Sequence, residues 1–164
     1  MKTQNKETLQ RKIRMAIWIT MLGLIVNGVS AFVLRFDLRI AQYFQNLLPE
    51  AIISWLNQVD HALTDTESRY SFMLYGYDWL GFAHLLIAIA FIGPLRDPLK
   101  NVWVVQFGMI ASVLSIIMAM VFERFRHIPI AWSGIDMAIG VVAFLVLFYC
   151  NKWINKLKEL SQVQ

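Results

Sequence analysis

Three ionisable side chains stand within or directly beside long apolar segments of the sequence, where an unpaired charge is costly. They are His84, Glu123 and Asp136. At helical spacing each shares a face with small residues, and small residues favour close contact between helices in membranes. The sequence therefore predicts that the three groups point inward at a similar depth, near the outer end of a helical bundle.

Two further groups could join this cluster. His127 follows Glu123 by four residues and shares its face if the helix continues, although Pro129 disfavours helical geometry in the residue before it. Asp78 is expected at the level of His84, but about 120° around the helix. Two imidazoles and two carboxylates, from His84, His127, Glu123 and Asp136, would form a plausible ligand shell for zinc or iron.

Three interpretations of this cluster stay open. It could bind a polar ligand or a lipid headgroup through His84, Glu123, Asp136, His127 and Asp78, or perform acid–base chemistry. It could hold a metal ion. It could instead be a structural network, in which the carboxylates pair with His84 and nearby arginines and lock the bundle. No spacing is specific to one of these, so no catalytic residue is assigned and enzymatic activity stays an open question.

The elements that must position these groups are apolar helices. Of 164 residues, 58% are hydrophobic and only 16% charged, whereas about a quarter of the residues in a soluble domain are charged. This composition excludes disorder, and the apolar runs argue against nucleic-acid binding despite the net charge of +4. About 20 apolar residues cross a bilayer. The sequence therefore predicts one all-α integral membrane domain, a four-helix transmembrane bundle with spans over residues 15–34, 79–95, 102–122 and 132–150.

The distribution of charge predicts the orientation. Ten of the 15 lysines and arginines fall in the leader, the turn at residues 94–101 and the tail. Because positively charged segments stay in the cytoplasm, both termini are expected there. A signal peptide with cleavage near Val29-Ser30-Ala31 is an alternative for the first span. An uncleaved helix is favoured, because the apolar run continues to Leu34.

The outer loop, residues 35–78, has apolar residues at helical spacing and is expected to form short amphipathic helices that cap the outer side. Pro49 suits a first helical position, and Thr64 followed by Glu67 is the pattern of a capping box that starts another helix. In the inner turn, Asp97 can cap the third span, with Pro98 at its first position. Asn27 is expected to form a hydrogen bond between helices.

A set of residues resembles a family of small, uncharacterised bacterial membrane proteins: Asp78-Trp79, His84, the Gly93–Pro98 turn, Phe107-Gly108-Met109, and Trp132 with Asp136. The resemblance implies a short multi-span fold in the bacterial cytoplasmic (inner) membrane and brings no activity or ligand. Two functional predictions follow for this chain. It is either a membrane protein with an outward-facing polar site, or a non-catalytic subunit or assembly factor. Its expected partners are the lipid bilayer and a protein partner in the membrane.

Overall fold

The computed structural model describes residues 2–162. This part of the chain is helical apart from short turns and contains no β-strand, which confirms the predicted all-α class. Its elements, in chain order, are α1 (Lys2–Phe32), α2 (Leu34–Tyr43), η1 (Gln45–Leu47), α3 (Glu50–Tyr70), η2 (Ser71–Leu74), α4 (Tyr75–Ala90), α5 (Ile92–Arg96), α6 (Val102–Phe125) and α7 (Ile130–Gln162).

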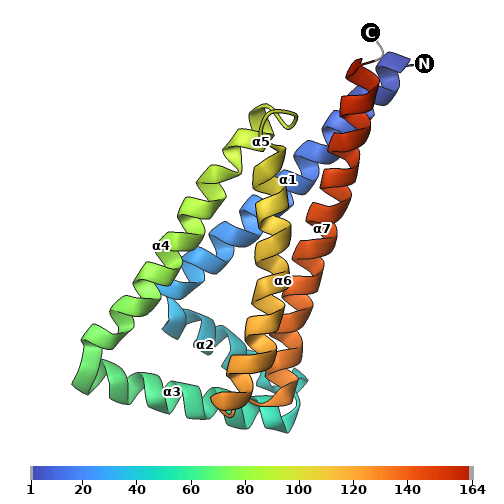
Figure 1. Ribbon diagram of the computed structural model, residues 1–164. Coiled ribbons are helices and arrows are strands. Elements are labelled where there is room, and N and C mark those ends of the chain that lie inside the picture. Colours follow the sequence, from blue (N-terminus) through green and yellow to red (C-terminus); the bar gives the residue numbers. More distant parts are fainter. Residues whose placement is uncertain (1, 163–164) are drawn as a thin grey trace.

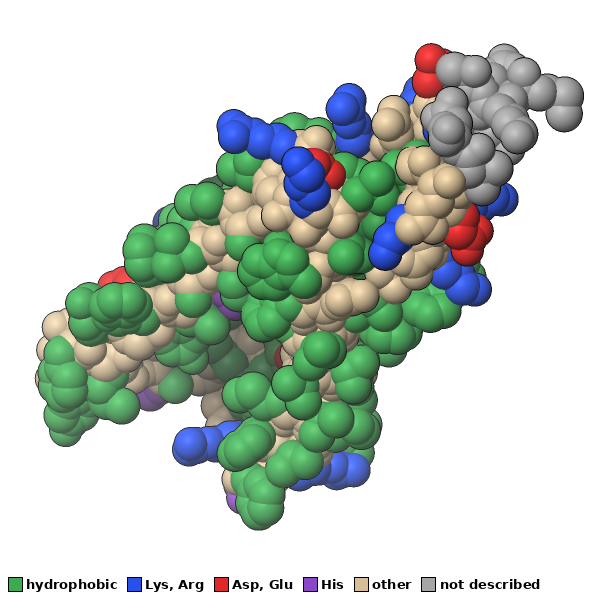
Figure 2. Space-filling view, turned by 45° about the horizontal axis from the view of Figure 1, so that its top comes forward, with side chains coloured by type: hydrophobic (Ala, Val, Ile, Leu, Met, Phe, Trp, Pro, Cys, Tyr) green, Lys and Arg blue, Asp and Glu red, His purple; other side chains and the backbone are tan. Residues whose placement is uncertain are grey.

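Four helical segments in this part of the chain are long and apolar enough to cross a membrane: Lys6–Phe32, Glu50–Arg96, Val102–Phe125 and Ile130–Gln162. They cover nearly all of the four predicted spans. Their outer surfaces are strongly apolar, since Val26, Ile110 and Ile139 are each at least 60% exposed. Hydrophobic side chains also cover much of the face shown in Figure 2. Such an extensive apolar surface is compatible with an integral membrane protein.

The long helices form two packed pairs that diverge from one end of the molecule. Helix α1 packs on α4 and α6 packs on α7, while α1 also contacts α7. The short helix α5 connects α4 to α6 at the narrow end, and α3 runs across the wide end (Figure 1). The first and last turns of the described chain lie side by side, with α7 continuing as one helix to Gln162. The tail after Cys150 keeps apolar residues at helical spacing, such as Trp153, Ile154 and Leu157, which favour this continuation of the helix.

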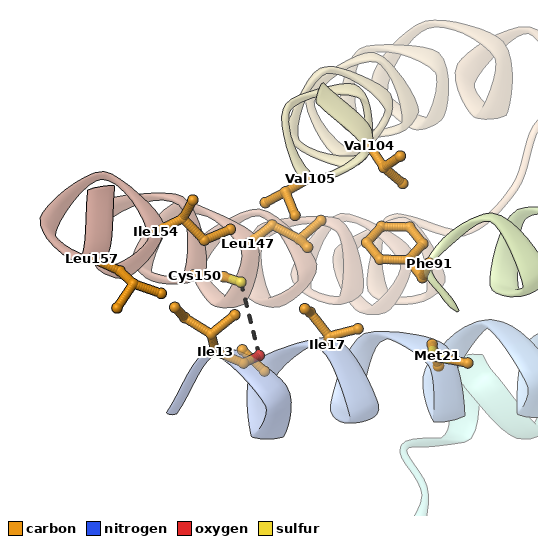
Figure 3. Packing of buried hydrophobic residues seen from close by; sticks show 11 residues of the cluster. Ile13, Ile17, Met21, Phe91, Val104, Val105, Leu147, Cys150, Ile154 and Leu157 are labelled. Carbon is orange, nitrogen blue, oxygen red and sulfur yellow. Dashed lines mark hydrogen bonds between the residues drawn. The ribbon is translucent and has the colours of Figure 1, made fainter. Parts of the chain in front are cut away.

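The larger hydrophobic core lies toward the narrow end, between α1, α6 and α7 (Figure 3). Ile13 and Ile17 from α1 meet Leu147 and Ile154 from α7, and all four are almost completely buried. Cys150 is also buried in this core, with its Sγ atom 4.0 Å from the carbonyl oxygen of Ile13. The lone cysteine therefore packs as a small apolar side chain.

A second, smaller core holds the segments at the wide end together. Leu38 of α2 packs with Ile52, Leu56 and Leu63 of α3, and Trp132 at the start of α7 covers this cluster. The apolar stripe along α3 therefore faces α2 and the end of α7.

The prediction of a separate helix beginning at Thr64 is wrong. Helix α3 runs without interruption from Glu50 to Tyr70. The Thr64 hydroxyl donates to the backbone carbonyl four residues earlier in the same helix (2.8 Å), as threonine side chains can do within a helix. Glu67 bonds Arg35 of α2 instead of completing a capping box. Pro49 is the residue before α3, with an extended ψ of 145°, and not its first helical residue.

The inner turn also differs from the prediction that Asp97 and Pro98 begin the third span. Helix α6 begins only at Val102. Asp97 Oδ1 accepts a hydrogen bond from the backbone N–H three residues later (3.1 Å), which stabilises the turn itself. The side-chain amide of Asn101 donates to the carbonyl oxygens of Gly93 (3.2 Å) and Asp97 (3.0 Å). These polar bonds are local to the turn, so they point to no ligand.

Candidate functional site

His84 lies where α4 crosses α1. Its Nδ1 atom is 2.8 Å from the Leu80 carbonyl oxygen, which can only accept, so Nδ1 carries the proton. The Nε2 atom is then an acceptor for the Asn27 side-chain amide on α1, at 3.3 Å. The expected hydrogen bond from Asn27 to another helix is therefore confirmed. Both ring nitrogens of His84 are engaged inside the chain.

Two glycines allow the helices to approach closely beside this hydrogen bond. A Cβ atom at Gly28 would lie 2.9 Å from the Gly81 carbonyl oxygen, and one at Gly81 would lie 2.6 Å from that of Gly28. Both distances are shorter than van der Waals contact, so only glycine fits at this crossing. The predicted small-residue face of the second span is confirmed, and it faces α1.

Glu123 near the C-terminal end of α6 and Asp136 near the N-terminal end of α7 are brought together, on either side of the turn that joins the two helices. The carboxyl group of Asp136 interacts with that of Glu123 and with the side chain of Trp132. Glu123 Oε2 is buried and accepts no hydrogen bond from the described residues.

His127 does not extend the helical face of Glu123. Helix α6 ends at Phe125, and His127 adopts a left-handed backbone conformation with φ of 56°. Its N–H bonds the Arg124 carbonyl oxygen (3.2 Å), and the Ile128 N–H bonds that of Glu123 (3.0 Å). This is the Schellman arrangement that ends many helices. His127 is exposed in the turn that leads to α7.

The predicted residues thus fall in separate places. Glu123 contacts Asp136 between α6 and α7, whereas His84 bonds Asn27 between α4 and α1. Within residues 2–162, no group of three or more His, Cys, Asp or Glu side chains is arranged to hold a metal ion. The fifth predicted residue, Asp78, lies elsewhere and lines a cavity.

This cavity, called here the α2 cavity, has a volume of about 460 Å³ and lies where α1 turns into α2. Helix α3 and the start of α4 complete its wall. Such a volume is in the range of about 300–1,000 Å³ found for ligand sites. Its lining comprises Ala31, Phe32, Val33, Leu34, Arg35, Phe36, Arg39, Leu63, Glu67, Leu74, Tyr77 and Asp78.

Four charged side chains line the α2 cavity, and two of them form an ion pair. Arg35 Nε donates to Glu67 Oε2 at 2.6 Å, and the same oxygen contacts a second nitrogen of the guanidinium group. The hydrogen bond from Arg35 lowers the pKa of the Glu67 carboxyl below its ordinary value. Arg39 and Asp78 are exposed and form no ion pair within the described part of the chain. The cavity therefore offers one cation and one anion to a ligand.

Aromatic side chains surround these charges. Phe32, Phe36 and Tyr77 line the cavity and are all about half-exposed or more. A charged lining beside exposed aromatic rings suits a molecule that has both a polar and an apolar part. Sequence reasoning missed this site, apart from Asp78. The available signal was Arg35 and Arg39, one helical turn apart directly after the first span.

No known protein family, curated protein or solved structure matches this chain. The resemblance to a bacterial membrane family therefore stays a prediction. What the chain can bind has to be inferred from the geometry of its own residues, and the α2 cavity provides the fullest set of unpaired groups.

Proposed function

We propose that this chain is an integral membrane protein that binds the head of an amphiphilic ligand in the α2 cavity. The observation that carries this proposal is the lining: the unpaired Arg39 and Asp78 line the same cavity as Phe32 and Phe36. The cavity adjoins the end of α1, one of the four segments able to span a membrane. A ligand there could place its polar head among the charges and its apolar part against the span.

The orientation we propose has both termini in the cytoplasm of a bacterium, with the chain in the cytoplasmic membrane. Support comes from the ten lysines and arginines of the leader, inner turn and tail. The first and last turns of the described chain lie at the same end of the molecule (Figure 1), and an even number of crossings places both termini on one side of the membrane. In this orientation α2 and α3 cap a four-helix bundle on the outer membrane surface. The α2 cavity then opens at the outer headgroup layer.

The charges suggest a zwitterionic headgroup. Arg39 can donate to a phosphate group in the bidentate manner typical of arginine. Asp78 can accept from a primary ammonium group. Arg35 is already neutralised by Glu67, so it contributes less to binding an anion. A phosphoethanolamine headgroup carries one negative and one positive group, which matches the two unpaired side chains.

A structural role fits the other predicted residues better. The hydrogen bond from Asn27 to His84 and the contact between Glu123 and Asp136 each link two helices inside the chain. These contacts support the interpretation of the polar residues as a structural network; a non-catalytic membrane subunit that uses them only in this way is the second function considered. We place His84, Glu123, Asp136 and His127 outside the proposed ligand site and keep Asp78 within it.

The experiment is to measure binding of phosphatidylethanolamine to the purified protein by native mass spectrometry. We expect Arg39→Gln and Asp78→Asn each to weaken binding about tenfold, as expected for the loss of one charge-assisted hydrogen bond. Arg126→Gln and Glu50→Gln are matched controls, because both residues are exposed but neither lines the cavity. Equal affinity in all four variants and the wild type would contradict the proposal.

A further inference from the structure

A second concavity lies between α1 and α7, near the two ends of the chain. This α1/α7 groove has a volume of about 220 Å³. It is lined by Lys12, Met15, Ala16 and Ile19 from α1 and by Leu145, Val146, Tyr149 and Trp153 from α7. None of these residues lines the α2 cavity. Its residues on α1 lie between positions 12 and 19, at least 12 positions, or about three helical turns, before those of α1 that line the α2 cavity.

The groove is apolar along most of its length and faces outward. Met15, Ile19 and Tyr149 on its rim are about half-exposed, and the small, buried Ala16 leaves room between them. Both helices belong to segments able to span a membrane. In a bilayer the groove meets lipid instead of water, so an acyl chain is the natural occupant for its apolar surface.

A cation stands at the end of the groove that is nearer the chain termini. The Lys12 ammonium nitrogen lies 5.8 Å from the centre of the Trp153 ring, within the range of a cation–π contact. Tryptophan rings favour the interface between acyl chains and headgroups. Lys12 is therefore at the depth where a phospholipid acyl chain joins its phosphate.

The surroundings of Lys12 are also positively charged. Arg11 and Arg14 flank it on α1, and Lys152 and Lys156 lie on the adjacent part of α7. Lys152 is held over the Phe148 ring, 4.9 Å from its centre, and not over the groove. The positive charge of Lys12, which stands at the groove itself, favours an anionic headgroup over a zwitterionic one by about 1 kcal/mol or a factor of five. The flanking charges do not line the groove and add less to this preference.

We infer that the α1/α7 groove binds an anionic phospholipid, with one acyl chain along Met15, Ile19 and Leu145 and the phosphate against Lys12. This site differs from the α2 cavity in its residues, in its position and in the charge of its headgroup. The two proposals can therefore fail separately.

The test is native mass spectrometry of the full chain with phosphatidylglycerol and, in parallel, phosphatidylcholine. We expect the wild type to retain one phosphatidylglycerol molecule in preference to phosphatidylcholine. Lys12→Gln should raise the Kd for phosphatidylglycerol about fivefold and that for phosphatidylcholine less, because the choline ammonium group already offsets the charge of the phosphate. Arg14→Gln, which also removes one positive charge but does not line the groove, should change either Kd less than about twofold.

A second pair of variants tests the groove itself. Ile19→Trp fills it and should abolish retention of phosphatidylglycerol, whereas Leu22→Trp, at an exposed position outside it, should not. Equal effects of Lys12→Gln and Arg14→Gln would show only general attraction between charges and would overturn the inference. Full retention by Ile19→Trp would also overturn it. Neither result would alter binding of phosphatidylethanolamine at Arg39 and Asp78.

Discussion

The crossing of α1 and α4 leaves no space for a methyl group at Gly81, which makes Gly81→Ala an informative perturbation. The added Cβ atom would lie 2.6 Å from the carbonyl oxygen of Gly28 and 2.8 Å from Cε2 of Phe32. The Phe32 ring can turn aside, but a helical carbonyl group cannot. Since ordinary contact begins at 3.4 Å, the two helices must separate by about 0.8 Å.

Two costs follow from that separation. Overpacking of a close contact costs about 1–3 kcal/mol. The hydrogen bond from Asn27 to His84 is already 3.3 Å long, and its loss adds about 0.6 kcal/mol, the average for such bonds between membrane helices. Gly76→Ala on the same helix is the control, because nothing lies within 4 Å of its Cβ position. Both variants gain the same helical preference of alanine over glycine. Gly81→Ala should therefore be about 2–4 kcal/mol less stable than Gly76→Ala.

Thermal unfolding in detergent micelles, followed by circular dichroism, measures this difference. For a chain of this size each kcal/mol lowers the midpoint temperature by about 2–4 °C, so Gly81→Ala should unfold on the order of 5–15 °C below Gly76→Ala. Equal midpoints would mean that α1 and α4 do not cross at Gly28 and Gly81. The positions of His84 and of the α2 cavity would then need revision.

Three further predictions concern other parts of the chain. Gly140→Leu should destabilise the α6–α7 pair by about 1–3 kcal/mol, because a Cβ atom there would lie 2.6 Å from an isoleucine of α6. Val141→Leu, at the exposed neighbouring position, should have only a small effect in the same unfolding assay. Since its arginine partner lowers the pKa of Glu67, the ion pair's contribution to stability is complete above the ordinary value of 4.5 and is lost as the pH falls below it. Midpoint temperatures measured between pH 6 and 3 should therefore fall further in the wild type than in Glu67→Gln, and parallel curves would refute this. In a variant without the native cysteine, a cysteine at Asn57 should react with an impermeant thiol reagent in intact cells and one at Lys158 should not; the reverse pattern would overturn the proposed orientation.

Much of the helical organisation could be predicted, because apolar length and charge distribution are local properties of the sequence. The four long apolar helices and the continuation of α7 through the tail follow from the spacing of apolar residues and needed no knowledge of tertiary contacts. The faces that carry Gly81 and Gly140 were predictable for the same reason, since small residues recur at helical spacing. Thr64 misled the prediction because a hydroxyl group that could cap a new helix can equally bond the backbone of the helix that contains it.

The candidate site was harder to predict, because its residues meet only through tertiary structure. Depth along a span indicated that His84, Glu123 and Asp136 are at one level, but it does not indicate which helices are neighbours. In the structure α4 packs on α1 and α6 packs on α7, so His84 is separated from the two carboxyl groups. The ion pair between Arg35 and Glu67 joins residues 32 positions apart on two amphipathic helices, and no local pattern marks it.

Photocrosslinking would test whether an amphiphilic ligand places its head in the α2 cavity, as we propose. A phosphatidylethanolamine analogue with a photoreactive group on its headgroup would be added to the protein in lipid nanodiscs, and the labelled peptides would be identified by mass spectrometry. We expect labelling within residues 31–39 and 74–78, the segments that contribute to the cavity lining, and loss of that labelling in Arg39→Gln. Labelling confined to other segments, or labelling of residues 31–39 that is unchanged in Arg39→Gln, would contradict it.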